Sequence, residues 1–209
     1  MNKTEKFWDA FAYKYDKITI KSEQTLSKTL IYTRKYLNAN DIVLDFACGT
    51  GSIADGIADD VKKIHAIDIS SKMIEVARRK TAERKIDNIE FAQLSIFDDT
   101  FGKETFNIVL AFNVLHLLED PPKVILRMNE LLVPGGLFIS STECGGENRR
   151  ALINVFSSLA SRMGLVPYIK FFTIPELEYK ITNEGFTILE TGNFHTFKQP
   201  NHFIVARKI

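Results

Sequence analysis

Short apolar runs alternate with amphipathic stretches along most of this 209-residue chain. The apolar runs end at acids or turn residues, which predicts strands buried in a sheet. The amphipathic stretches repeat apolar residues at helical spacing, which predicts helices between them. The predicted strands are residues 42–46, 63–67, 89–94, 106–112 and 137–141. The predicted helices are residues 4–16, 22–37 and 52–58, a helix capped by Ser70 or Ser71 that runs through Arg84, and residues 121–132.

This order of elements predicts an α/β fold, a doubly wound, seven-stranded, mostly parallel sheet with an antiparallel last strand and helices on both faces. A helix over residues 175–184 should stop at Gly185. Residues 186–191 and 202–207 predict the last two strands. Only a loop separates them, too short for a crossover helix, so they should pair antiparallel. The Pro-Gly-Gly sequence at 134–136 predicts a turn before the fifth strand.

An extra segment lies between the fifth strand and the last helix. Its apolar residues form a stripe at helical spacing, Leu152, Val155, Phe156, Leu159 and Met163. One interpretation is a helix that packs on the core. The other is a cover over a ligand crevice, because insertions after sheet strands lie where α/β folds bind ligands.

Composition and charge argue against several partners. The formal net charge is +1, and the two basic runs, 78–80 and 149–150, predict solvated helix faces, so a nucleic-acid partner is not expected. Cys48 and Cys144 lack the spacing of a disulfide framework or a zinc site, which predicts free thiols in a reducing compartment and no metal. The N-terminal residues do not form a signal peptide, and no apolar stretch reaches about 18 residues. We therefore expect a cytoplasmic protein with no membrane partner.

The motif with the clearest chemistry is Val-Leu-Asp-Phe-Ala-Cys-Gly-Thr-Gly-Ser at residues 43–52. It predicts a strand, a tight turn and a helix N-terminus, the arrangement with which α/β folds hold an adenosine-bearing cofactor. Gly49 and Gly51 let the backbone approach a ligand closely, because neither has a Cβ. Asp45 places a carboxylate at the carboxyl end of the strand, where such folds bind ligands.

These residues resemble the class I S-adenosylmethionine-dependent methyltransferases. The resemblance rests on motifs in the family's order at residues 43–51, 65–74, 131–136 and 172–186, and it covers residues 40–209. It is closest in character to the small-molecule branch, similar to ubiquinone/menaquinone-biosynthesis methyltransferases. It implies a Rossmann-like fold, S-adenosyl-L-methionine as cofactor, S-adenosyl-L-homocysteine as product, and in-line transfer of a methyl group to an O, N, C or S atom of a small molecule.

The resemblance also implies which residues hold the amino-acid end of the cofactor. Asp45 and the backbone of Gly49 would bind this end. Thr50 and Gly51 belong to the same loop. Phe112, with the residue that follows it, ends the fourth strand beside the methionine and sulfonium portion.

A second set would hold the adenosine end. Asp68 would accept hydrogen bonds from the ribose hydroxyls, a role that suits a carboxylate. Ile69 and Met73 would flank the adenine ring. Ser95 and Ile96 would read the adenine amine, although the family often has an acid at the position of Ser95.

His116 is the candidate catalytic residue. It follows the fourth strand near the expected crevice, and histidine titrates near neutrality. A general base is needed only if the acceptor carries a proton, and structural packing is the other interpretation of this histidine. Tyr13 and Tyr15, in the N-terminal segment, are candidates to line the site or to fasten an amphipathic helix to the core.

We expect one methyltransferase domain over residues 1–209, acting as a monomer or a homodimer. The parts would be an N-terminal helical segment and candidate lid (1–38), a cofactor-binding core (40–144), a helical insertion and candidate substrate cover (145–172), and a C-terminal helix and strand pair (173–209).

Two other functions stay open at this point. Gly49, Gly51 and Ala54 also satisfy the G-x-G-x-x-A pattern of an NAD-type oxidoreductase, with Asp68 at about the distance of a ribose-binding acid. A cofactor-binding protein without catalysis has the same sequence features as an enzyme. A nucleic-acid or protein methyltransferase is less favoured, because no basic face is visible and the fourth strand lacks an Asn-Pro-Pro-Tyr loop.

Overall fold

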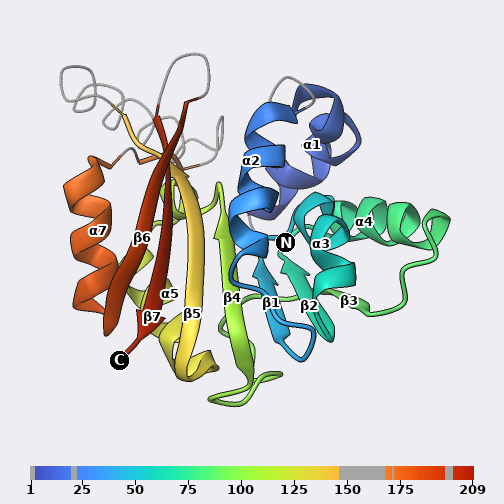
Figure 1. The fold of residues 1–209 in the computed structure, drawn as a ribbon. Coiled ribbons are helices and arrows are strands. Elements are labelled where there is room, and N and C mark those ends of the chain that lie inside the picture. The colour runs from blue at the N-terminus through green and yellow to red at the C-terminus, as the bar shows by residue number, and fades with distance from the viewer. Residues whose placement is uncertain (1–2, 20–22, 146–167, 171, 196–199) are drawn as a thin grey trace.

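Seven strands form one sheet in the order β3-β2-β1-β4-β5-β7-β6 in the computed structural model, which describes residues 3–19, 23–145, 168–170, 172–195 and 200–209 (Figure 1). The strands are β1 (Ile42–Phe46), β2 (Lys63–Asp68), β3 (Ile89–Gln93), β4 (Phe106–Phe112), β5 (Leu132–Glu143), β6 (Phe186–His195) and β7 (Pro200–Lys208). Strands β1 to β5 pair in parallel, whereas β7 pairs antiparallel with both β5 and β6. The predicted fold class and the antiparallel last strand are confirmed.

Helices cover both faces of this sheet. They are α1 (Lys3–Thr19), α2 (Glu23–Arg34), α3 (Ser52–Ile57), α4 (Ser71–Glu83), α5 (Pro121–Leu131) and α7 (Ile174–Asn183), with short 3-10 turns η2 (Ala58–Asp60) and η3 (Leu115–Leu117). Apolar side chains of α5 and α7 pack into one buried cluster, which contains Ile125 and Leu177. Side chains of α3 and α4 pack into a second cluster on the other face, which contains Ile57 and Ile74. The sheet is therefore apolar on both sides, as its near-continuous apolar runs predict.

Helix caps explain several boundaries. The Ser70 side chain accepts a hydrogen bond from the backbone N–H of Met73, so Ser70 rather than Ser71 caps α4. Asp120 caps α5 in the same way. Thr173 and Glu176 form a reciprocal capping box at the start of α7.

The predicted turn at 134–136 is wrong as a boundary, because β5 begins at Leu132, directly after α5. The pairing with β4 shifts register in this region: Phe106 pairs with Leu132, but Ile108 pairs with Leu137. The strand thus accommodates the Pro-Gly-Gly sequence as an irregularity at the sheet's end, with Gly135 at φ +73°. The predicted helical stripe of the insertion lies outside the described residues.

Candidate functional site

Two adjoining cavities lie at the carboxyl ends of β1, β2 and β4. Their volumes are about 140 Å³ and about 610 Å³, and we call them the smaller and the larger cavity. Helices α1 and α2 lie at this end of the sheet in Figure 1, and both contribute lining residues. The wall common to both cavities consists of Trp8, Tyr15, Ala47, Gly49, Phe112, Asn113 and Leu117. This is where parallel α/β sheets bind ligands.

The turn between β1 and α3 brings backbone to this common wall. Gly49 has φ +55° and lines both cavities, as expected for a glycine that must approach a ligand. Gly51 is different, because it lines neither cavity. Its φ is +78°, and an added Cβ would lie 3.0 Å from the Phe91 ring. Gly51 is therefore required by the turn and by packing beneath it.

Asp68, at the end of β2, lines only the smaller cavity. Its carboxylate accepts hydrogen bonds from the backbone N–H groups of Gly49 (3.0 Å) and Ser70 (2.8 Å). These bonds tie β2 to the glycine turn of β1. Burial raises the pKa of Asp68 above its usual value, although the two N–H groups act in the opposite direction.

Asp45, in β1, lines only the larger cavity and is 2% exposed. The backbone N–H of Ala54 donates to its carboxylate, but Oδ2 has no hydrogen-bond partner. Burial, and secondly the charge of Asp68, raise the pKa of Asp45 from 3.8 to about 7. A buried carboxylate with an unpaired oxygen is costly, so this site suits a cationic ligand.

The residues predicted to flank and read adenine divide into two groups. Met73 is buried and lines the smaller cavity, and so does Ile69. Ser95 and Ile96 line neither cavity, and Leu94 lines the smaller one in their place. The Ser95 N–H instead donates to Asp98, in a local turn.

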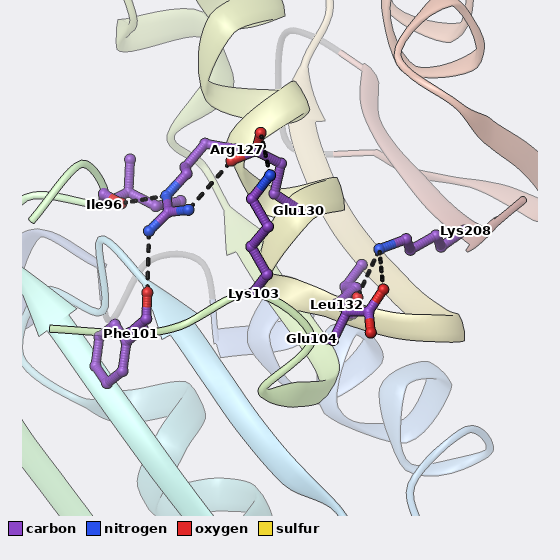
Figure 2. Close-up of polar contacts among 8 residues, drawn as sticks. All are labelled: Ile96, Phe101, Lys103, Glu104, Arg127, Glu130, Leu132 and Lys208. Carbon is purple, nitrogen blue, oxygen red and sulfur yellow. Dashed lines mark hydrogen bonds and ion pairs between the residues drawn. The ribbon is translucent and has the colours of Figure 1, made fainter. Parts of the chain in front are cut away.

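Arg127, on α5, holds the loop that contains Ile96. Figure 2 shows its guanidinium donating to the backbone carbonyls of Ile96 (3.3 Å) and Phe101 (3.1 Å) and pairing with Glu130. The Arg127 side chain is only 16% exposed, so these bonds form in a largely dry environment. Ile96 is thus a buried core residue whose backbone is fixed from the helix side.

A polar bridge fixes the end of β4. Phe112 and Asn113 line both cavities, and Asn113 has a left-handed backbone, with φ +54°. Asn201 of β7 donates to Asn113 (2.9 Å) and also bonds Ser141 of β5. Ala47, on the same wall, is left-handed as well. Such backbone strain in non-glycine residues is typical of ligand sites.

His116 lies in η3 and lines the larger cavity. It is 8% exposed, and its Nδ1 atom has no hydrogen-bond partner. Burial lowers the pKa of His116 to about 4, so the ring is neutral at pH 7 and only weakly basic.

Glu143 is a lining residue that sequence reasoning missed. It ends β5, is partly buried, and lines the larger cavity together with Asp45 and His116. Burial raises the pKa of Glu143. Its position at the carboxyl end of a central strand was the available signal, since the same position singled out Asp45.

Helix α1 is fastened to α4 beside the smaller cavity. Asp9 accepts hydrogen bonds from the Ser70 hydroxyl (2.6 Å) and the Lys72 N–H (3.1 Å). Tyr13 bonds Glu75 and lines neither cavity, whereas Tyr15 lines both.

The charges around the two cavities have one sign. Asp45, Asp68 and Glu143 line them, and no lysine or arginine of the described ranges does.

Residues 3–19, 23–145 and the described C-terminal stretches contain no cluster of potential metal ligands. None of the helices in the described part of the chain has the length and apolar character needed to cross a membrane.

Comparisons with known proteins identify the family of the chain. The model of a family described as "Methyltransferase domain" matches residues 37–184. The ubiquinone biosynthesis O-methyltransferase of Coxiella burnetii is 24% identical over 172 residues, which are 80% of this chain and 72% of that protein. Magnesium protoporphyrin IX methyltransferase from Synechocystis, solved with bound S-adenosylhomocysteine, is 18% identical with a TM-score of 0.75, and the match covers 100% of both chains. An S-adenosylmethionine-dependent methyltransferase from Methanosarcina mazei is 20% identical with a TM-score of 0.70, over 85% of this chain and 97% of that one.

The family match covers most of the chain, including the glycine turn, Asp68 and the end of β4. The resemblance found in the sequence motifs is thereby confirmed. The chain belongs to the methyltransferase-domain family and is an S-adenosylmethionine-dependent methyltransferase of the small-molecule branch.

Proposed function

We propose that this methyltransferase acts on a hydroxyl group of a small aromatic acceptor that binds in the larger cavity. The observation that carries the proposal is the lining of that cavity. Phe7, Phe11 and Phe112 supply aromatic surface, whereas the polar side chains His116 and Glu143 lie on the same lining. Ligand sites of this kind are mostly apolar with a few placed polar groups. The relative from Coxiella burnetii is named an O-methyltransferase, which makes a hydroxyl the first acceptor to test.

The fit of the cofactor to these residues rests on charge. S-adenosylmethionine carries an ammonium, a carboxylate and a sulfonium group, a net positive charge, and when bound it supplies an electrophilic methyl group. Asp45, buried with an unpartnered Oδ2 atom, would bind the amino-acid end together with the Gly49 backbone. Thr50 lines the larger cavity and would contribute to the same end. Gly51 would act by shaping the turn.

The adenosine end would occupy the smaller cavity. Asp68 would accept from the ribose hydroxyls, and Ile69 and Met73 would contact the adenine ring. Ser95 and Ile96 would act only through the backbone of their loop, because neither lines a cavity.

The organisation of the domain is also part of the proposal. Segment 1–38 would act as a lid, since α1 and α2 line the larger cavity, and segment 145–172 would cover the acceptor. The protein would work in the cytoplasm as a monomer or homodimer, and its two cysteines are free. No nucleic acid would be required.

Thermal unfolding with S-adenosylmethionine, S-adenosylhomocysteine and NAD in parallel tests the cofactor. A ligand at 100 times its dissociation constant adds about 2.7 kcal/mol of stability, so the first two should raise the melting temperature. A methyl-release screen of hydroxylated aromatic compounds then tests the acceptor. Stabilisation by NAD alone would refute the proposal.

A further inference from the structure

One acid and one imidazole in the larger cavity are left without a role once the cofactor's charges are assigned. Asp45 is positioned for the cationic end of the cofactor, and Asp68 lies in the other cavity. The acid is Glu143 and the imidazole is His116. Both line only the larger cavity, and the Nδ1 atom of the buried His116 has no hydrogen-bond partner. No hydrogen bond or ion pair joins the Glu143 carboxylate to another described residue.

The two groups differ in what they can do with a proton. His116 is neutral and, with its pKa near 4, would hold a proton poorly at pH 7. Partial burial raises the pKa of Glu143, so its carboxylate is a stronger base than an exposed one. A neutral imidazole that accepts or donates a hydrogen bond can orient an acceptor without taking its proton.

We propose that Glu143 is the catalytic residue that takes the proton of the acceptor's hydroxyl, and that the acceptor is an aromatic molecule without negative charge. This inference rests on the proposed function. The acceptor oxygen forms a bond to the methyl carbon as the bond from carbon to sulfur breaks. The electron pair of the broken bond stays on sulfur, and the hydroxyl proton passes to a Glu143 carboxylate oxygen.

The exclusion of acidic acceptors follows from the lining. A carboxylated or phosphorylated compound would meet two carboxylates, Asp45 and Glu143, and no lysine or arginine among the described lining residues. Only Asp45 would be offset by the cofactor. A like charge next to Glu143 would raise the energy of the bound acceptor. The cavity should therefore discriminate by charge between compounds of the same shape.

Three compounds and three proteins form the test. The acceptors are catechol, 4-methylcatechol and 3,4-dihydroxybenzoate, which share the two hydroxyls and differ in charge. The proteins are the wild type, Glu143→Gln and, as a matched control, Glu83→Gln, which removes an exposed acid on α4. We expect Glu143→Gln to lower kcat for the neutral catechols about 10²-fold or more, the range of general-base catalysis, while the control stays within about 2-fold of the wild type. Wild-type kcat/KM should be at least about 10-fold lower for the benzoate than for catechol, and this ratio should shrink in Glu143→Gln.

A pH profile separates catalysis from a structural role. It is measured at saturating cofactor, because Asp45 also titrates in this cavity. The titratable groups that face Glu143 across the cavity are Tyr15, Asp45, Cys48 and His116. The wild-type rate should rise with pH as Glu143 ionises and then level off. Glu143→Gln should lose this acid limb but keep the thermal shift produced by S-adenosylhomocysteine.

The failures of the two proposals are distinguishable. If S-adenosylhomocysteine does not stabilise the wild type, the proposed function is wrong. If it does, the inference is overturned by any of three results: no turnover of any neutral catechol, a Glu143→Gln rate within about 3-fold of the wild type with the same acid limb, or a preference for the benzoate.

Discussion

Replacing Asp45 by Asn should stabilise the protein without ligand at high pH and weaken cofactor binding. The carboxyl's pKa rises from 3.8 to about 7 on folding, chiefly through burial. Each pKa unit corresponds to 1.36 kcal/mol, so ionised Asp45 disfavours the folded state by about 4 kcal/mol. Asn keeps an oxygen that can accept from the Ala54 N–H and removes the charge. The ionised carboxylate therefore lowers the stability of the protein without ligand, at a residue that we propose binds the cofactor.

The sign of the pH dependence follows from the raised pKa. Below pH 4 the carboxyl is protonated in both folded and unfolded chains and contributes nothing. Between about pH 4 and 7 the unfolded chain ionises first, so wild-type stability falls relative to the variant as pH rises. Above pH 7 the difference stays constant. Any fixed cost of the buried amide is the same at every pH and cancels in this comparison.

The assay is urea unfolding of both proteins at four or five values between pH 4.5 and 8. The difference in free energy of unfolding, Asp45→Asn minus wild type, should grow by several kcal/mol over this range. Asp59→Asn, at an exposed aspartate, is the matched control and should show no comparable growth. A difference that stays flat within about 1 kcal/mol would refute the assigned burial of charge.

Cofactor binding should favour the wild type over Asp45→Asn, the opposite of the order expected for stability without ligand. S-adenosylmethionine should bind the wild type more tightly as pH rises through 7, because its cation favours the ionised carboxylate. Calorimetry in buffers of different ionisation enthalpy should detect proton release at pH 6 to 7. The Asn variant should bind more weakly and release no proton, and equal affinity at every pH would contradict this account.

Three further substitutions test individual positions. Asp68→Ala should weaken cofactor binding by about 1–3 kcal/mol through lost charged hydrogen bonds, and unchanged calorimetric affinity would refute its ribose role. Gly51→Ala should cost about 1–3 kcal/mol of unfolding free energy, because φ is +78° and the new Cβ meets Phe91; Gly102→Ala, at an ordinary φ, is the control. His116→Gln should leave S-adenosylhomocysteine affinity intact and lower kcat less than about 10-fold, since its pKa of about 4 makes the imidazole a weak base. A 10²-fold loss would restore His116 as the base.

The alternation of apolar runs and amphipathic stretches predicted the sheet because each run is buried from both sides. The antiparallel pairing of β6 and β7 was predicted from the short loop between them, because no crossover helix fits in it. The start of β5 could not be predicted in this way. Local turn chemistry at 134–136 suggested a break, but pairing with β4 carries the strand through it with a shifted register.

The site residues likewise fall into those that short sequence motifs predict and those whose placement depends on tertiary contacts. Asp45, Gly49 and Asp68 lie at strand ends within short motifs, so the sequence identified them and the fold brings them together. Ser95 and Ile96 were predicted from their position in a motif, but neither lines a cavity, and Arg127 on a distant helix donates to the Ile96 carbonyl in their loop. No local pattern contains that information.

Glu143 illustrates why residues of the acceptor side are harder to find than those of the cofactor side. The cofactor is the same throughout a family, so its contacts form recurring motifs. The acceptor differs, and its contacts come from single positions on different strands, here β5 and η3 beside β1. What identifies Glu143 is the charge balance of the assembled cavity. Its described lining contains two carboxylates, Asp45 and Glu143, and no lysine or arginine, whereas the cofactor brings one net positive charge. One acid, Glu143, is thus left for the second substrate. It can be recognised only in the folded structure, where residues from separate strands line one cavity.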